Sequence, residues 1–86
     1  MPRLSSFYGI VIAMYYREHG TPHFHARYGQ HDASIEIGTL EVLGGSLPPR
    51  AMTLVREWAS LHAEELAANW RRARNRERLE RIAPLP

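Results

Sequence analysis

The sequence contains no cysteine among its 86 residues. A disulfide framework, a zinc site made of thiolates and a cysteine nucleophile are therefore excluded. The absence of cysteine also fits a reducing compartment.

Long apolar segments and targeting signals are absent as well. The longest apolar-rich run, residues 7–16, is far shorter than the roughly 20 residues that a membrane helix needs. Residues 1–6 do not combine a charged segment, an apolar segment and a small-residue cleavage site, so we expect no signal peptide. These absences predict a cytoplasmic protein that does not associate with a membrane.

Lysine is also missing, so all 11 basic side chains are arginines. The net charge of +2 is uneven, because residues 1–47 carry −1 and residues 48–86 carry +3. The planar guanidinium group suits phosphate recognition, and the charge permits a nucleic-acid partner without requiring one. The arginine run over residues 71–81 is interrupted by Glu77 and Glu80. It fits a solvated helix face, a contact with RNA phosphates or a docking surface for an acidic protein.

The short chain predicts one domain over residues 1–86. A chain of this length buries only about 60–65% of the surface that its unfolded form exposes, so its core is thin. A protein partner or a homo-oligomer would add buried surface. The hydrophobic content of 44% still indicates a globular fold rather than a disordered chain.

The pattern of apolar residues changes near residue 47. The first part predicts a three- to four-stranded antiparallel β-meander, with strands at about 7–16, 22–28, 33–38 and 41–43. Residues 7–16 are apolar on both alternating faces, which indicates a central, well-covered strand. From about residue 48 to 76 the apolar residues recur at intervals of one, three or four, which predicts helix.

The helical region allows two interpretations, one long helix or two helices with a bend near residues 60–62. We favour the bend. Pro48 and Pro49 are typical of a helix N-terminus, and Ser46 is a candidate cap.

The apolar faces predict how the layers pack. One face of the meander carries four apolar side chains, namely Phe24, Tyr28, Ile35 and Ile37. The only large apolar stripe available to cover it is the helical one containing Trp58, Leu66 and Trp70. We therefore expect an α+β fold of two layers, with the sheet packed on one long or bent C-terminal helix.

The opposite sheet face is polar and carries the candidate chemistry. His23, His25 and Arg27 alternate along one strand, so their side chains point the same way, with Ser34 or Glu36 expected across from them. We expect both imidazoles to look outward together.

Three interpretations of this face stay open. In RNA cleavage, histidine serves as acid or base near neutral pH, and Arg27 would stabilise the phosphate charge. In a metal site, the His-x-His pair plus His19 or Glu18 would supply three ligands and leave an open position for a divalent ion. Alternatively, the histidines are simply polar residues on the wet face of an amphipathic sheet. The candidate site residues are accordingly Glu18, His19, His23, His25 and Arg27.

Several short strings occur in a distinctive order along the chain. They include Phe7-Tyr8-Gly9-Ile10, Glu18-His19-Gly20, Pro22-His23-Phe24-His25-Ala26, Glu57-Trp58 and Asn69-Trp70. These strings resemble the family called domain of unknown function 4160, and the resemblance extends from Met1 to about Leu85. Thr21 stands where that family usually has a second proline, and Leu40 stands where a glycine is common.

The resemblance implies a small bacterial protein, often encoded beside a partner of the domain of unknown function 2442 type. Such a pair looks like a type II toxin–antitoxin module, in which this chain would be the toxin and the partner a cognate antitoxin-like protein. The implied function is action on RNA or translation, with His19, His23 and His25 in the family's characteristic segment. A non-catalytic regulatory partner of a small cognate protein, or a histidine-rich metal-binding domain, is the alternative.

Overall fold

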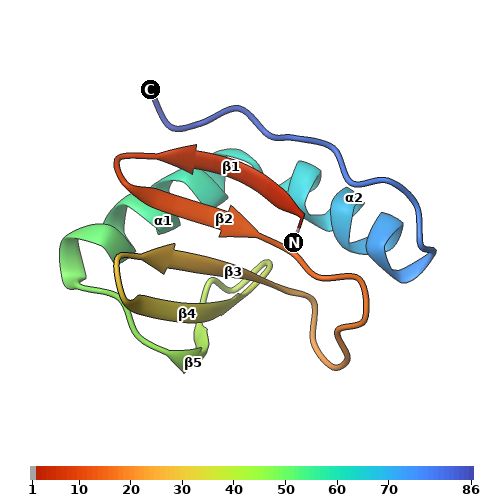
Figure 1. Ribbon diagram of the computed structural model, residues 1–86, viewed down its shortest axis with the longest axis horizontal. Coiled ribbons are helices and arrows are strands. Elements are labelled where there is room, and N and C mark those ends of the chain that lie inside the picture. The colour runs from red at the N-terminus through yellow and green to blue at the C-terminus, as the bar shows by residue number, and fades with distance from the viewer. Residues whose placement is uncertain (1) are drawn as a thin grey trace.

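A computed structural model describes residues 2–86 and contains five strands followed by two helices (Figure 1). They are β1 (Arg3–Phe7), β2 (Ile10–Ala13), β3 (His23–Tyr28), β4 (His31–Glu36), β5 (Val42–Gly45), α1 (Pro49–Leu61) and α2 (Ala63–Arg74). The strands form one sheet in the order β1-β2-β3-β4-β5, and each neighbouring pair is antiparallel. The predicted α+β meander is therefore confirmed, with five strands instead of three to four.

The prediction of a single strand over residues 7–16 is wrong, because this segment contains a hairpin turn. Tyr8 and Gly9 both have positive φ, 50° and 81°, and Phe7 pairs with Ile10 across them. Two central residues with positive φ are what a tight two-residue hairpin needs. The sequence does not predict β1, because Ser5 is polar and interrupts the apolar pattern. In the structure the side chain of Ser5 is nevertheless buried.

The remaining strands are shifted by one or two residues from their predicted ranges of 33–38 and 41–43. The turn after β3 contains only residues 29–30. His31 is therefore the first residue of β4, where it pairs with Tyr28 of β3 instead of lying in a loop. Leu40, where the family pattern favours glycine, has a left-handed φ of 62°. A glycine would adopt this conformation without steric strain, which explains the preference.

The helical region does break at His62, as the favoured interpretation predicts. His62 has φ −122° and ψ 28°, so it ends α1 and precedes α2. Pro49 occupies the first turn of α1 and Pro48 is its N-cap residue, with no side-chain cap. Ser46 is therefore not the cap. None of the helices formed by residues 2–86 has the length and apolar character needed to cross a bilayer.

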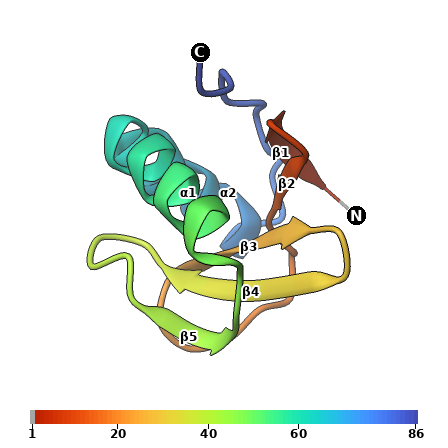
Figure 2. The same cartoon turned by 90° about the vertical axis from the view of Figure 1, so that its left-hand side faces the viewer.

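Both helices lie on one side of the sheet, which curves around them (Figure 2). Trp58 is fully buried, and its ring centroid lies 5.4 Å from that of Phe7 and 6.1 Å from that of Phe24. Ile35 is also fully buried, as predicted. Tyr28 was expected in this core but is 39% exposed, since it lies at the end of β3 and lines a surface pocket beside the start of α1.

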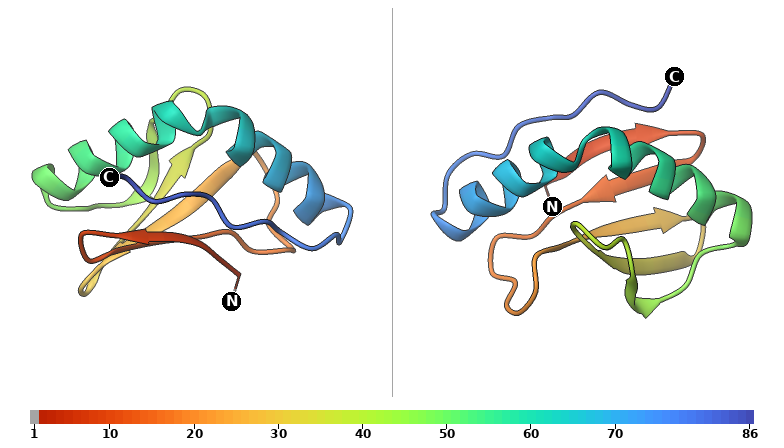
Figure 3. Two further views of the ribbon diagram at one scale, coloured as in Figure 1. Left: turned by 90° about the horizontal axis from the view of Figure 1, so that it is seen from above. Right: turned by 180° about the vertical axis from the view of Figure 1, so that it is seen from behind.

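The irregular segment after α2 packs between the helices and β1 (Figure 3, left). The backbone N–H of Ile82 donates to the carbonyl of Leu4 at 2.8 Å, and the indole N–H of Trp58 donates to the carbonyl of Ala83 at 2.8 Å. The side chain of Asn69 donates to the carbonyl of Glu80 and accepts from its N–H, at 2.8 and 2.9 Å. The tail is therefore part of the packed structure.

Replacing Asn69 with alanine should lower the free energy of unfolding by about 1–3 kcal/mol, because the backbone groups of Glu80 lose buried partners. Urea denaturation of the variant and the parent measures this difference. Asn75→Ala is the control, since Asn75 is exposed and its side chain lies outside this network; its effect should stay within about 0.5 kcal/mol. Equal effects of the two substitutions would contradict the role given to Asn69.

Candidate metal centre

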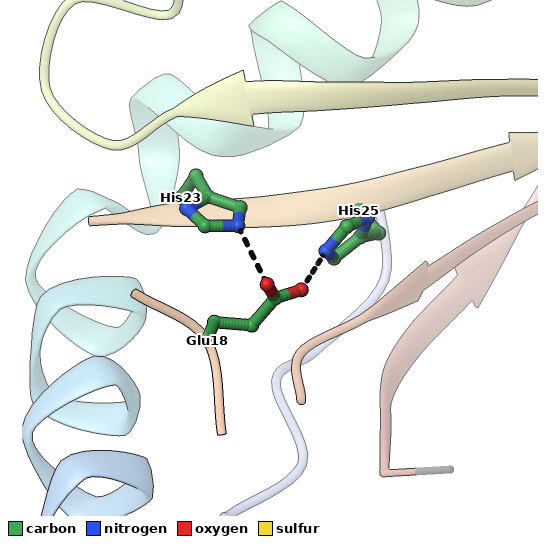
Figure 4. A group of neighbouring side chains, drawn as sticks. All are labelled: Glu18, His23 and His25. Carbon is green, nitrogen blue, oxygen red and sulfur yellow. Dashed lines mark hydrogen bonds and ion pairs between the residues drawn. The ribbon is translucent and has the colours of Figure 1, made fainter. Parts of the chain in front are cut away.

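Strand β3 and the connection before it bring three polar side chains together. His23 and His25 are two residues apart on β3, so both imidazoles lie on the same side of the strand. The connection from β2 to β3 carries Glu18 back toward them, and its carboxylate lies between the two rings (Figure 4). The Nε2 of His25 is 2.5 Å from Oε1 of Glu18, and the Nε2 of His23 is 3.6 Å from Oε2.

His23 does not look outward as predicted. It is only 8% exposed, because the ring of Trp70 on α2 packs against it with centroids 5.2 Å apart. The rings of His23 and His25 are 5.3 Å apart, and Tyr15 contacts His25 edge to face at 4.7 Å. The two histidines are therefore neighbours, but one is buried and the other is partly exposed.

The hydrogen bond between His23 and Thr21 determines which nitrogen of the His23 ring carries a proton. Its Nδ1 is 2.7 Å from the carbonyl oxygen of Thr21. A carbonyl oxygen can only accept, so Nδ1 must carry the proton of this bond. In the neutral ring, the lone pair of Nε2 then points toward the carboxylate of Glu18, an arrangement that calls for a proton or another cation between them.

The second histidine also has a partner behind it. Ser34 lies directly opposite His25 in the β3–β4 register, and its Oγ is 3.4 Å from Nδ1 of His25. Glu36 lies opposite His23. Of the two residues expected across from the row, Ser34 is the one whose side chain contacts it.

Arg27 and His19 lie beside the cluster of Glu18, His23 and His25 but do not join it. Arg27 pairs with Asp32 at 3.5 Å and lines a pocket of about 120 Å³ with His25. His19 is exposed, and within residues 2–86 the group close enough to share a metal ion does not include it. Of the two alternatives for a third ligand, His19 and Glu18, the structure brings Glu18 within range, whereas His19 lines a different pocket.

The pKa of Glu18 reflects two opposing effects. Burial raises it, but the hydrogen bond from His25 and the charges that His25 and His23 carry when protonated outweigh burial. The pKa of Glu18 therefore lies below its ordinary value of 4.5. The carboxylate remains ionised, as a metal ligand must be.

This lowered pKa predicts how the metal-free protein responds to acid. A carboxyl whose pKa is lower in the folded state stabilises that state above its unfolded pKa, and the contribution disappears as pH falls through the folded value. The contribution of Glu18 should thus be complete above about pH 5 and lost progressively below its ordinary value of 4.5.

Urea unfolding in the presence of a chelator, at several pH values between about 7 and 3, tests this dependence. The stability advantage of the parent over Glu18→Gln should shrink toward acid pH. A gap that stays constant across the range would show that the charge of Glu18 is not stabilised by the histidines.

The three donor atoms are close enough to share one cation. One atom from each of Glu18, His23 and His25 lies within 4.8 Å of the others. Ligand atoms about 2.0–2.1 Å from a tetrahedral ion lie roughly 3.3 Å apart, so modest side-chain rotations would bring all three into range. Two histidines and one carboxylate on one side of an ion leave coordination positions open, as in non-haem iron and catalytic zinc sites.

Sequence reasoning missed the groups that support these ligands. The carbonyl of Thr21 orients His23 through a backbone atom, which no side-chain pattern can indicate. Trp70 is recognisable as an apolar residue of the helical stripe, but its contact with His23 depends on where α2 ends relative to β3. Tyr15 falls in the segment for which the sequence predicts a strand, but in the structure it follows the end of β2.

Comparison with known proteins places these residues in a family. A family model described as Domain of unknown function (DUF4160) matches residues 9–71, a range that contains Glu18, His23 and His25. No curated protein and no solved structure matches the chain. Because the matched range covers well over half of the sequence, the chain belongs to the DUF4160 family.

Proposed function

We propose that this protein is a metal-dependent enzyme whose centre holds one divalent ion through Glu18, His23 and His25. The observation that carries the proposal is the convergence of both Nε2 atoms on one carboxylate, while Nδ1 of His23 is occupied by the carbonyl of Thr21. Metal-bound histidines usually donate their other N–H to an oxygen in this way.

The exposure of the ligands supports a centre that a substrate can reach. The side chains of His25 and Glu18 are 27% and 28% exposed, whereas His23 is nearly covered. His25 also lines the same pocket as Arg27, whose guanidinium could stabilise negative charge on a substrate. A bound divalent ion would supply Lewis acidity and an activated water.

Metal-free acid–base chemistry by both histidines is less well supported. Such a mechanism needs two imidazoles with nitrogens free to reach the substrate. The nitrogens of His23 face Thr21 and Glu18, and its ring packs against Trp70. His23 is therefore better suited to hold an ion than to exchange a proton with a substrate.

Metal uptake tests the proposal. Chelator-treated protein would be incubated separately with zinc, ferrous iron, manganese and nickel, and bound metal counted by native mass spectrometry. The proposal predicts one ion per chain for at least one metal. His31→Ala, which removes an exposed histidine of β4 outside the cluster, should bind the same amount. No uptake above background for any of these ions would overturn the proposal.

A cellular role as a toxin-like component acting on RNA or translation is a second proposal. It is supported by the family resemblance and by the position of Arg27 beside the partly exposed His25. Expression of the chain alone should then arrest growth, and His23→Ala or His25→Ala should relieve the arrest while His31→Ala does not. If both variants arrest growth like the parent, the histidines do not act in toxicity.

A cognate antitoxin-like partner of the domain of unknown function 2442 type belongs to the same proposal. The outer strand β5 offers a place for it, because this strand is exposed along its length and carries the apolar side chains of Val42 and Leu43. Size-exclusion chromatography of the co-expressed pair tests this interaction. Separate elution at micromolar concentration would exclude both the antitoxin pairing and the non-catalytic, regulatory alternative.

A further inference from the structure

Another pocket adjoins the candidate metal centre, because Glu18 belongs to both. It has a volume of about 400 Å³ and lies where the β2–β3 connection approaches the end of α2 (Figure 1). Its lining consists of Tyr16, Arg17, Glu18, His19, Arg74 and Arg76. Two segments more than 50 residues apart in sequence therefore contribute basic side chains to one hollow.

The charges in this pocket are unbalanced. Arg17, Arg74 and Arg76 are exposed, and none of them forms an ion pair within residues 2–86. The only carboxylate in the lining, Glu18, is already paired with His25. Three free guanidinium groups around one hollow favour an anion with several oxygen atoms, such as a phosphate.

Helix electrostatics account for only part of this arrangement. The C-terminal end of α2 carries partial negative charge, which favours basic residues such as Arg74 in the last turn. Arg17, however, comes from the β2–β3 connection and not from the helix. The dipole of α2 therefore does not explain why Arg17 lines the same pocket as Arg74.

Arg76 occupies a backbone position that is unusual for arginine. Its φ is +58°, and the N–H of Glu77 bonds to the carbonyl of Arg72 at 2.8 Å in the pattern that closes helices. Glycine is the usual residue in this left-handed position because a side chain is strained there. An arginine at this point directs a cation into the pocket despite the strain.

We infer that Arg17, His19, Arg74 and Arg76 form a phosphate-binding subsite for single-stranded RNA. Tyr16, which is 38% exposed and lines the same pocket, offers a ring on which a base can stack. Glu18 belongs to both the pocket and the metal centre, so a phosphate held by the arginines lies beside the metal ligands. The role of this pocket as part of a substrate site rests on the proposed function, whereas its binding of RNA does not.

The test measures binding of a labelled single-stranded RNA octamer to metal-free protein at low salt by fluorescence anisotropy. The double variant Arg17→Ala/Arg74→Ala should weaken binding by at least about tenfold and reduce its salt dependence. Arg78→Ala/Arg81→Ala is the matched control, because it also removes two positive charges, and Arg78 and Arg81 are exposed and do not line the pocket. Its effect should stay below about threefold in total.

Tyr16→Ala and competing ligands define what the pocket recognises. Tyr16→Ala should weaken binding of the RNA, and inorganic phosphate should compete with the RNA less strongly than a mononucleotide does. No binding by the parent, an equal loss in Arg78→Ala/Arg81→Ala, or equal affinity for an acidic peptide of the same length would overturn the assignment.

The same variants separate this inference from the proposed metal function. Arg17→Ala/Arg74→Ala should still take up one metal ion per chain, because it retains Glu18, His23 and His25. If the parent takes up metal but does not bind RNA, the inferred phosphate-binding subsite is wrong and the proposed metal centre is supported. If the parent binds RNA but takes up no metal, the proposed metal centre is wrong and the phosphate-binding pocket is supported.

Discussion

Replacing His23 with alanine should weaken metal binding by more than about a hundredfold. Loss of an outer hydrogen-bond partner alone typically costs 10–100-fold in metal affinity. His23 is a proposed direct ligand and has such a partner in the carbonyl of Thr21. Competition against a chromophoric chelator measures the change. His31→Ala should bind as the parent does, since His31 lies outside the cluster.

Because His23 is buried against Trp70, the alanine variant also loses packing. His23→Gln retains a polar side chain of similar reach and serves as a second variant, with circular dichroism to confirm folding. It too should lose stoichiometric binding. A folded His23→Gln protein with the metal affinity of the parent would show that His23 is not a ligand.

Replacing Trp58 with alanine should have the largest effect on stability. Truncating a fully buried aromatic side chain lowers the free energy of unfolding by about 3–5 kcal/mol. Trp58 is fully buried, contacts Phe7 and Phe24, and donates its N–H to the carbonyl of Ala83. Domains have a total stability of about 5–15 kcal/mol, so this variant should lose a large fraction of its stability and unfold at a much lower urea concentration.

Trp58→Phe separates the two contributions of this residue. It keeps most of the apolar volume and loses the N–H, so a smaller decrease is expected, of about 1–3 kcal/mol. Urea denaturation of both variants measures the difference. An alanine variant within about 1 kcal/mol of the parent would contradict the central position of Trp58 in the core.

Periodicity was sufficient to predict the elements whose two faces differ. Phe24 and Ile35 alternate with polar residues and are buried, and the helical stripe through Trp58 and Leu66 covers them. The first hairpin could not be recognised in this way. Its turn at Tyr8 and Gly9 interrupts a run that is apolar throughout, and the polar Ser5 is a buried strand residue. The reversal of the chain at this turn depends on the backbone conformation of Tyr8 and Gly9, which a hydrophobicity pattern does not indicate.

The candidate site was predictable where it depends on strand geometry alone. The spacing of two residues places His23 and His25 side by side, and Glu18 was among the expected participants. The burial of His23 was not predictable, because it depends on Trp70 reaching the start of β3 from α2. Neither was the separation of His19 from its neighbour Glu18, since an irregular connection does not alternate its side chains as a strand does.

X-ray absorption spectroscopy of the zinc-loaded protein tests the shared site of Glu18, His23 and His25 most directly. The predicted spectrum shows nitrogen and oxygen scatterers at about 2.0–2.1 Å, with multiple scattering from two imidazole rings. In Glu18→Gln/His25→Ala, the contribution of one ring should be lost together with tight binding. A spectrum without imidazole scattering, or one unchanged in that variant, would contradict the metal centre.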